Sequence, residues 1–228
     1  IIKRCGDCVM NPSNAHEQHL PTAAELEAAK LPVEAEQLAS AIVAAQLRTL
    51  YADADGECFP AECLHKLGPL YQRWLGATLR YLAEQGRVDV DAGTQRHRFA
   101  PSEPVDALWR RWDAAKPAWH ANANHRAYLT LIEACLRNLP EILTGAVPAT
   151  DVMFPESSMH MVEGIYKHNL VADHFNRVLG ENLRAALTAK IARGERGIRL
   201  LEIGAGTGGT TAALLPMLRE FGDAIEEY

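Results

Sequence analysis

The sequence predicts a mainly α-helical N-terminal part with a small β-hairpin, followed by the first strand–helix unit of an α/β core that is incomplete in this chain. Apolar residues recur at helical spacing through most of residues 21–192, and two short β-prone segments flank a turn at 91–94. An apolar run that begins at Ile198 and ends in the acidic residue Glu202 then leads into a glycine-rich loop and a further helix. We expect a linker over 1–20, a helical lid subdomain over 21–150 and the N-terminal part of the core over 151–228.

Composition excludes several classes of protein. The 228 residues are 48% hydrophobic and 23% charged, with a net charge of −6, and they show no basic stripe of the kind that binds nucleic acid. No apolar run reaches the roughly 20 residues of a membrane span. The chain begins without a Met or a signal-peptide layout, so we expect a piece of a longer polypeptide. Its five unevenly spaced cysteines indicate reduced thiols in a cytoplasmic protein.

The first helix is expected to begin near Thr22, which has Glu25 three residues later as its capping-box partner. Apolar residues at helical spacing over 38–51 continue the helical part until a turn at 53–56. The next helical stretch, 64–86, ends at Gly86, which suits the position just after a helix.

A short hairpin is expected next, from 88–90 and 98–99. A helix followed by a small hairpin resembles a winged helix, and such modules can bind DNA. Asp89 and Asp91 lie where a DNA-binding wing needs cations, so a packing or lid role is favoured.

Residues 103–145 are expected to be helical, and Trp109, Trp112 and Trp119 are assigned to the core in preference to an acyl channel. After a boundary near 150, further helices are predicted over 159–166 and 171–192.

The loop after this apolar run is the main candidate for a binding site. Its glycines, Gly204, Gly206 and Gly208, free the backbone for a sharp turn and for close approach of a ligand. Amides at the start of the following helix suit a carboxylate, and Glu202 suits an ammonium group. These groups together favour the methionine part of S-adenosylmethionine (SAM).

Two other interpretations of the loop stay open. Gly204, Gly206 and Gly209 also satisfy the G-x-G-x-x-G pattern of dinucleotide sites, so a nicotinamide-dependent reductase is an alternative. A glycine-rich turn without a ligand is the other. A P-loop is excluded because the segment has no Gly-Lys-Ser/Thr ending.

Two motifs resemble the C-methyltransferase domains of bacterial modular polyketide synthases. The segment 200–211 resembles motif I of that family, and FPESSMHMVEGIYKHN at 154–169 resembles its upstream FP-x-x-S-M-x-x-V-E-G-I-Y-x-x-N pattern. The tail over 224–228 is similar to the family's lead-in to its second strand. The resemblance is strong over about 152–228 and weaker over 21–150.

The resemblance implies a Rossmann-like SAM-methyltransferase core beneath a helical lid. Such a domain transfers the methyl group of SAM to the α-carbon of a β-ketoacyl or malonyl-type thioester on an acyl carrier protein, beside neighbouring synthase domains. The cofactor-binding candidates are Glu202, Gly204, Ala205, Gly206, Thr207, Gly208, Tyr166 and Asn169.

For Tyr166 and Asn169, ordinary packing and capping roles are equally open. The family's base is a histidine assisted by a carboxylate later in the domain, so we expect the catalytic residues beyond Tyr228 and an inactive isolated chain. A non-catalytic pseudo-methyltransferase that serves as a structural domain is a further alternative.

Several histidines and cysteines invite other assignments. His160, His168 and His174 are expected to be surface or boundary residues. The group Cys5, Cys8, His16 and His19 has the composition of a zinc site, but its central loop is shorter than is usual in zinc modules. An ordinary linker is therefore favoured, and no metal is predicted.

Overall fold

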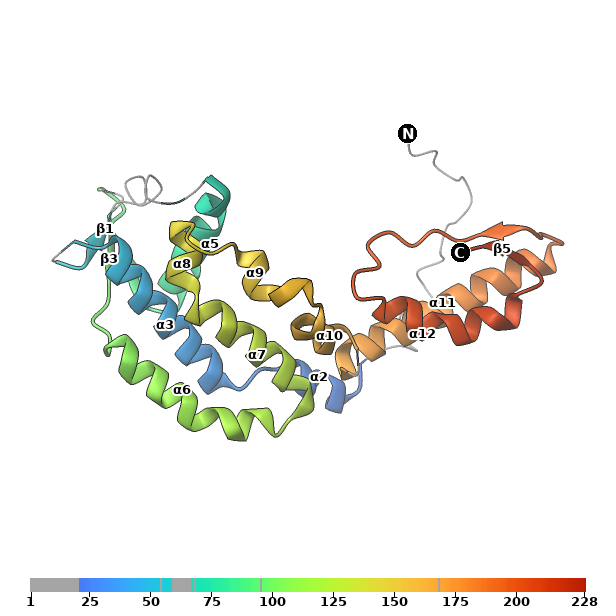
Figure 1. The fold of residues 1–228 in the computed structure, drawn as a ribbon, viewed down its shortest axis with the longest axis horizontal. Coiled ribbons are helices and arrows are strands. Elements are labelled where there is room, and N and C mark those ends of the chain that lie inside the picture. Colours follow the sequence, from blue (N-terminus) through green and yellow to red (C-terminus); the bar gives the residue numbers. More distant parts are fainter. Residues whose placement is uncertain (1–20, 54, 59–66, 68, 95, 168) are drawn as a thin grey trace. The chain divides into compact units, whose positions relative to one another are not determined.

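The computed structural model describes residues 21–53, 55–58, 67, 69–94, 96–167 and 169–228. These residues form two compact units (Figure 1). One unit is 31–169, and the other joins the segment up to Lys30 with 170–228. The domain boundary expected near 150 is a different division of the chain, and it stays a prediction.

The unit 31–169 is a helical assembly built around α3 (Val33–Tyr51), which packs against α6, α7 and α8. The other helices of this unit are η1 (Pro69–Tyr71), α5 (Gln72–Glu84), α6 (Val105–His120), α7 (Ala123–Arg137), α8 (Leu139–Thr144), α9 (Ala149–Met153), η2 (Pro155–Ser157) and α10 (His160–Tyr166). Its core contains fully buried side chains such as Ile42, Leu47 and Leu82.

The tryptophans of α6 belong to this core, as the sequence predicted. Trp112 and Trp119 are buried, and Trp109 packs against the core with part of its surface exposed. The ring of Trp112 meets the other two edge to face, with centroid separations of 5.9 Å to Trp109 and 5.1 Å to Trp119.

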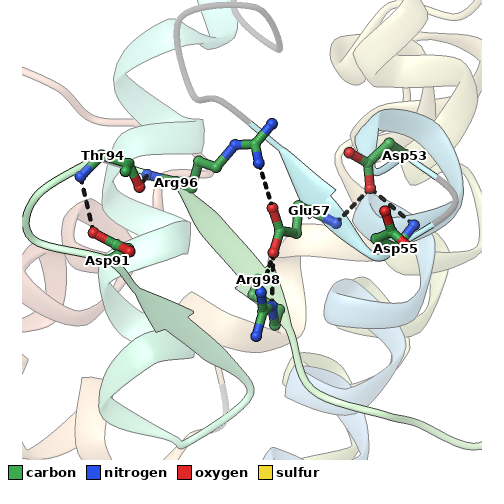
Figure 2. A network of polar contacts seen from close by, with 7 residues as sticks. All are labelled: Asp53, Asp55, Glu57, Asp91, Thr94, Arg96 and Arg98. Atoms are coloured by element: carbon green, nitrogen blue, oxygen red, sulfur yellow. Dashed lines mark hydrogen bonds and ion pairs between the residues drawn. The ribbon is translucent and has the colours of Figure 1, made fainter.

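The predicted hairpin is present as β2 (Val88–Val90) and β3 (His97–Phe99), and β1 (Glu57–Cys58) extends it to three antiparallel strands in the order β1-β3-β2. Glu57 accepts hydrogen bonds from the Arg96 and Arg98 side chains across the sheet (Figure 2). In the turn, Asp91 accepts hydrogen bonds from backbone amides, including that of Thr94, and these bonds lower the pKa of its carboxyl. These charged side chains thus stabilise the small sheet.

The second unit contains α2 (Ala23–Ala29), α11 (Leu170–Ala192), β4 (Ile198–Arg199), α12 (Gly209–Leu218), η3 (Arg219–Phe221) and β5 (Ile225–Glu227). α11 packs against both α12 and α2, and β4 pairs with β5 in parallel. Leu187, Leu214 and Leu218 form its buried core. The predicted capping box of α2 is confirmed, because the Glu25 amide donates to Thr22 Oγ1 and the Thr22 amide donates to Glu25 Oε2.

Two expectations for this unit were wrong in detail. The strand expected to end at Glu202 spans only Ile198–Arg199, and beyond it Leu201 and Ile203 are more than four-fifths exposed. An apolar parallel strand depends on burial of both faces, and the described residues supply no cover for these two side chains. His174 is buried and not at the surface, because α2 packs over α11 and places Glu25 Oε1 3.1 Å from His174 Nδ1.

Some expectations fall outside the described residues. These are the linker 1–20 with Cys5, Cys8, His16 and His19, and also His168. Within the part of the chain that the structure describes, no cluster of His, Cys, Asp or Glu is arranged to hold a metal ion. Among the described helices, none combines the length and the apolar character that crossing a bilayer requires.

Candidate functional site

The glycine loop connects β4 to α12 and turns sharply at three glycines. Gly204, Gly206 and Gly208 have φ angles of +83°, +55° and +71°, a region that strains residues with a side chain. A Cβ atom added to Gly204 or Gly208 would meet nothing within 4 Å, so backbone conformation is what requires glycine here. Ala205 and Thr207 lie between these glycines, and the Gly208 amide closes the turn on the Ala205 carbonyl at 2.8 Å.

The N-terminus of α12 offers backbone donors beside this loop. Gly208 is the N-cap residue, and no side chain caps the helix. The first amides of a helix have no partner within it, and the helix dipole adds partial positive charge at that end. This end of α12 therefore suits an anionic group such as a carboxylate.

Glu202 supplies the opposite charge. Its Oε2 atom accepts one hydrogen bond from Thr211 Oγ1 and one from the Tyr228 hydroxyl, each 2.6 Å long. The bond from Thr211, followed by that from Tyr228, lowers the pKa of the Glu202 carboxyl. Burial and the adjacent carboxylate raise the pKa of Tyr228, so at neutral pH an ionised Glu202 faces a neutral tyrosine.

The start of α12 is also anchored to α11. Thr210 Oγ1 donates a hydrogen bond to Asn176 Oδ1 at 2.8 Å. The side chain of Thr210 is thus bonded to α11, whereas that of the adjacent Thr211 is bonded to Glu202.

Sequence reasoning did not assign Asn176, Thr211 or Tyr228 to the site. Thr211 carried a signal, as a hydroxyl residue at the start of a helix, whereas Tyr228 reaches Glu202 only through the pairing of β5 with β4.

Tyr166 and Asn169, the other predicted binding residues, belong to the unit 31–169. Tyr166 ends α10 and is 55% exposed. Asn169 is buried, and its Nδ2 lies 3.4 Å from the Asn124 carbonyl, so its packing role is evident. A role for either residue in binding a ligand stays a prediction.

The groups of the loop fit a ligand with an amino-acid end. The Glu202 carboxylate matches an ammonium group, and the amides at the uncapped start of α12 match a carboxylate. The positive φ angles leave the glycine backbone open, without side chains between it and a ligand. If a dinucleotide bound here, the Glu202 carboxylate would lie beside its negatively charged pyrophosphate. The loop therefore suits a dinucleotide less well.

The sequence is related to known synthases. No protein-family model matches it. It is 42% identical over 177 residues to the polyketide synthase PksM of Bacillus subtilis, an alignment that covers 76% of this chain and 4% of PksM. With the polyketide synthase ThaQ of Burkholderia thailandensis the identity is 44% over 188 residues, covering 81% of this chain and 9% of ThaQ.

Solved structures with a similar fold are carbon methyltransferases. The DszA carbon methyltransferase has a TM-score of 0.73 at 27% identity, covering 91% of this chain and 54% of that chain. The CurJ carbon methyltransferase has a TM-score of 0.63 at 26% identity, covering 80% of this chain and 48% of that chain. The chain thus spans less than a tenth of the synthases it matches, and about half of these two solved chains.

Proposed function

Because this chain belongs to the carbon-methyltransferase family of polyketide synthases, we propose that it is the N-terminal portion of a SAM-dependent C-methyltransferase domain. The domain transfers a methyl group to the α-carbon of a β-ketoacyl or malonyl-type thioester carried by an acyl carrier protein. The observation that carries this proposal is that one glycine loop lies between an ionised acid, Glu202, and the uncapped start of α12. The fold around it is similar to solved carbon methyltransferases.

SAM would be held by its amino-acid end. In this proposal Glu202 receives the ammonium group, and the backbone of 204–208 with the first amides of α12 receives the carboxylate. Tyr166 and Asn169 remain candidate ligand contacts on the resemblance alone. When bound, SAM supplies an electrophilic methyl group on a good leaving group, so the residues of this chain contribute chiefly binding and orientation.

We assign no catalytic base to these residues. Removal of the α-proton requires a base near the acceptor carbon, and the resemblance implies a histidine–carboxylate pair later in the domain. The partners in the proposal are the acyl carrier protein and the neighbouring domains of a cytoplasmic synthase.

The proposal is tested on a polypeptide that contains this chain and spans the whole length of the solved carbon methyltransferases, here called the full-length domain. Isothermal titration calorimetry with SAM and with NADPH measures cofactor choice. Mass spectrometry of β-ketoacyl and malonyl acyl carrier protein measures methyl transfer.

Binding of SAM with methylation of either carrier-bound thioester supports the proposal. Binding of SAM without transfer to either would overturn the enzymatic part and assign a structural pseudo-methyltransferase. Binding of NADPH without SAM would replace the proposal with a reductase.

A further inference from the structure

We propose that Thr211 and Tyr228 are positioning residues, which orient the Glu202 carboxylate so that its Oε1 atom receives the ammonium group of the ligand. This inference rests on the proposed function, because it concerns the same cofactor site. It assigns separate tasks to the two oxygens of one carboxylate.

The geometry separates the two oxygens. Both hydrogen bonds, from Thr211 Oγ1 and from the Tyr228 hydroxyl, end on Oε2 of Glu202 at 2.6 Å. Among the residues that the structure describes, no hydrogen bond or ion pair is made to Oε1 of Glu202. One oxygen is thus occupied by protein donors, and the other keeps its capacity to accept.

The two donors come from different elements. Thr211 lies in the first turn of α12, and Tyr228 directly follows β5. Glu202 itself lies in the irregular segment after β4, where a side chain retains more freedom than in a regular element. Bonds from two separate elements restrict rotation of the carboxyl group before a ligand arrives, which reduces the entropy cost of binding.

The chemical nature of the donors distinguishes Glu202 from neighbouring acids. In the same unit, Glu195 pairs with Lys190, Glu220 with Arg184 and Glu226 with Arg199. Those carboxylates are neutralised by cations of the protein. Glu202 is held by two neutral hydroxyls, which leave its negative charge available to an ammonium group.

The experiment compares three thioether ligands that cannot transfer a methyl group, so the measurement is of binding alone. S-adenosylhomocysteine has both the ammonium and the carboxylate. Its decarboxylated analogue keeps only the ammonium, and 5′-methylthioadenosine has neither. Dissociation constants are measured by calorimetry on the full-length domain and on its Thr211→Val and Tyr228→Phe variants.

We expect each substitution to weaken binding of both ammonium-containing ligands about tenfold, which corresponds to roughly 1.4 kcal/mol. Binding of 5′-methylthioadenosine should change less than twofold. Thr211→Ser keeps the hydroxyl and should restore the affinity.

Thr210→Val is the matched control, because it removes the neighbouring hydroxyl, which bonds Asn176, and keeps the backbone amide. We expect it to leave the ratio of the three dissociation constants unchanged.

Different results separate the two proposals. If the unmodified domain binds none of the three ligands, the proposed function fails. If it binds them but Tyr228→Phe and Thr211→Val weaken all three equally, the two residues are merely structural and the inference is overturned. Unchanged affinities in both variants would overturn it as well.

Discussion

Gly164 lies at a close approach between two helices of the unit 31–169, and its replacement offers a quantitative test of the fold. α10 packs against α7 there, and a Cβ atom built on Gly164 would lie 2.9 Å from Ala127 Cβ. Carbon atoms pack optimally at about 3.5–4.0 Å. Because Ala127 Cβ is bonded directly to the backbone, it cannot rotate away, so Gly164→Ala must push the two helices apart.

The expected change in the free energy of unfolding is the difference between an overpacking cost and a gain in helix propensity. Overpacking of this kind costs about 2 kcal/mol. Alanine in place of glycine inside a helix returns about 1 kcal/mol. We therefore expect Gly164→Ala to lower the free energy of unfolding by about 1 kcal/mol.

The reciprocal change gives the sharper test. Ala127→Gly alone should also cost about 1 kcal/mol, because it loses helix propensity. In the double variant the two propensity terms cancel and the clash is gone. Its stability should return to within about 0.5 kcal/mol of the original, so the coupling energy is about 2 kcal/mol.

Urea unfolding followed by circular dichroism measures all four proteins, provided that the m-values agree. Additive effects, with the double variant about 2 kcal/mol less stable, would refute the close packing of α10 on α7. So would a Gly164→Ala variant more stable than the original. Since α10 ends at Tyr166, the packing of α10 on α7 also helps to position this predicted ligand-binding residue.

Three further predictions concern other parts of the chain. Gly208→Ala should cost about 1 kcal/mol in urea unfolding, because Gly208 has a φ of +71°, and it should weaken SAM binding in calorimetry. Burial raises the pKa of Glu133, but hydrogen bonds from Lys116 and Arg137 outweigh this and lower it. A carboxyl pKa that is lower in the folded than in the unfolded protein stabilises the fold at pH values above the unfolded-state pKa. This stabilisation is lost as the pH falls through the folded-state pKa. Glu133→Gln should therefore cost about 2 kcal/mol at pH 7 and flatten the loss of stability in acid, as measured by urea unfolding across pH. Trp112→Ala should cost about 4 kcal/mol by the same assay, since the ring is fully buried in the core, and a loss under 1 kcal/mol would contradict that burial.

Local chemistry accounts for the parts of the fold that could be predicted. The capping box of Thr22 and Glu25 is made by residues three positions apart, so it depends little on the rest of the chain. Gly204 and Gly208 adopt positive φ angles that the glycine-rich motif indicates by itself. The hairpin of β2 and β3 likewise follows from short β-prone segments around a turn.

The parts that were missed depend on distant contacts. Burial of His174 requires α2 to pack on α11, with Glu25 149 positions away in the sequence. The strand before the glycine loop ends at Arg199, where Leu201 and Ile203 lack cover among the described residues, and an apolar run does not specify what will cover it.

The sequence by itself determined the family and the location of the glycine loop, because both depend on motifs of consecutive residues. It also indicated that an acid ends the apolar run, at Glu202. Only the tertiary structure decided which groups hold that acid, because Tyr228 lies 26 positions away and reaches Glu202 only when β5 pairs with β4. Hydrogen bonds need atoms within about 3 Å, and such proximity between distant residues is a property of the folded chain.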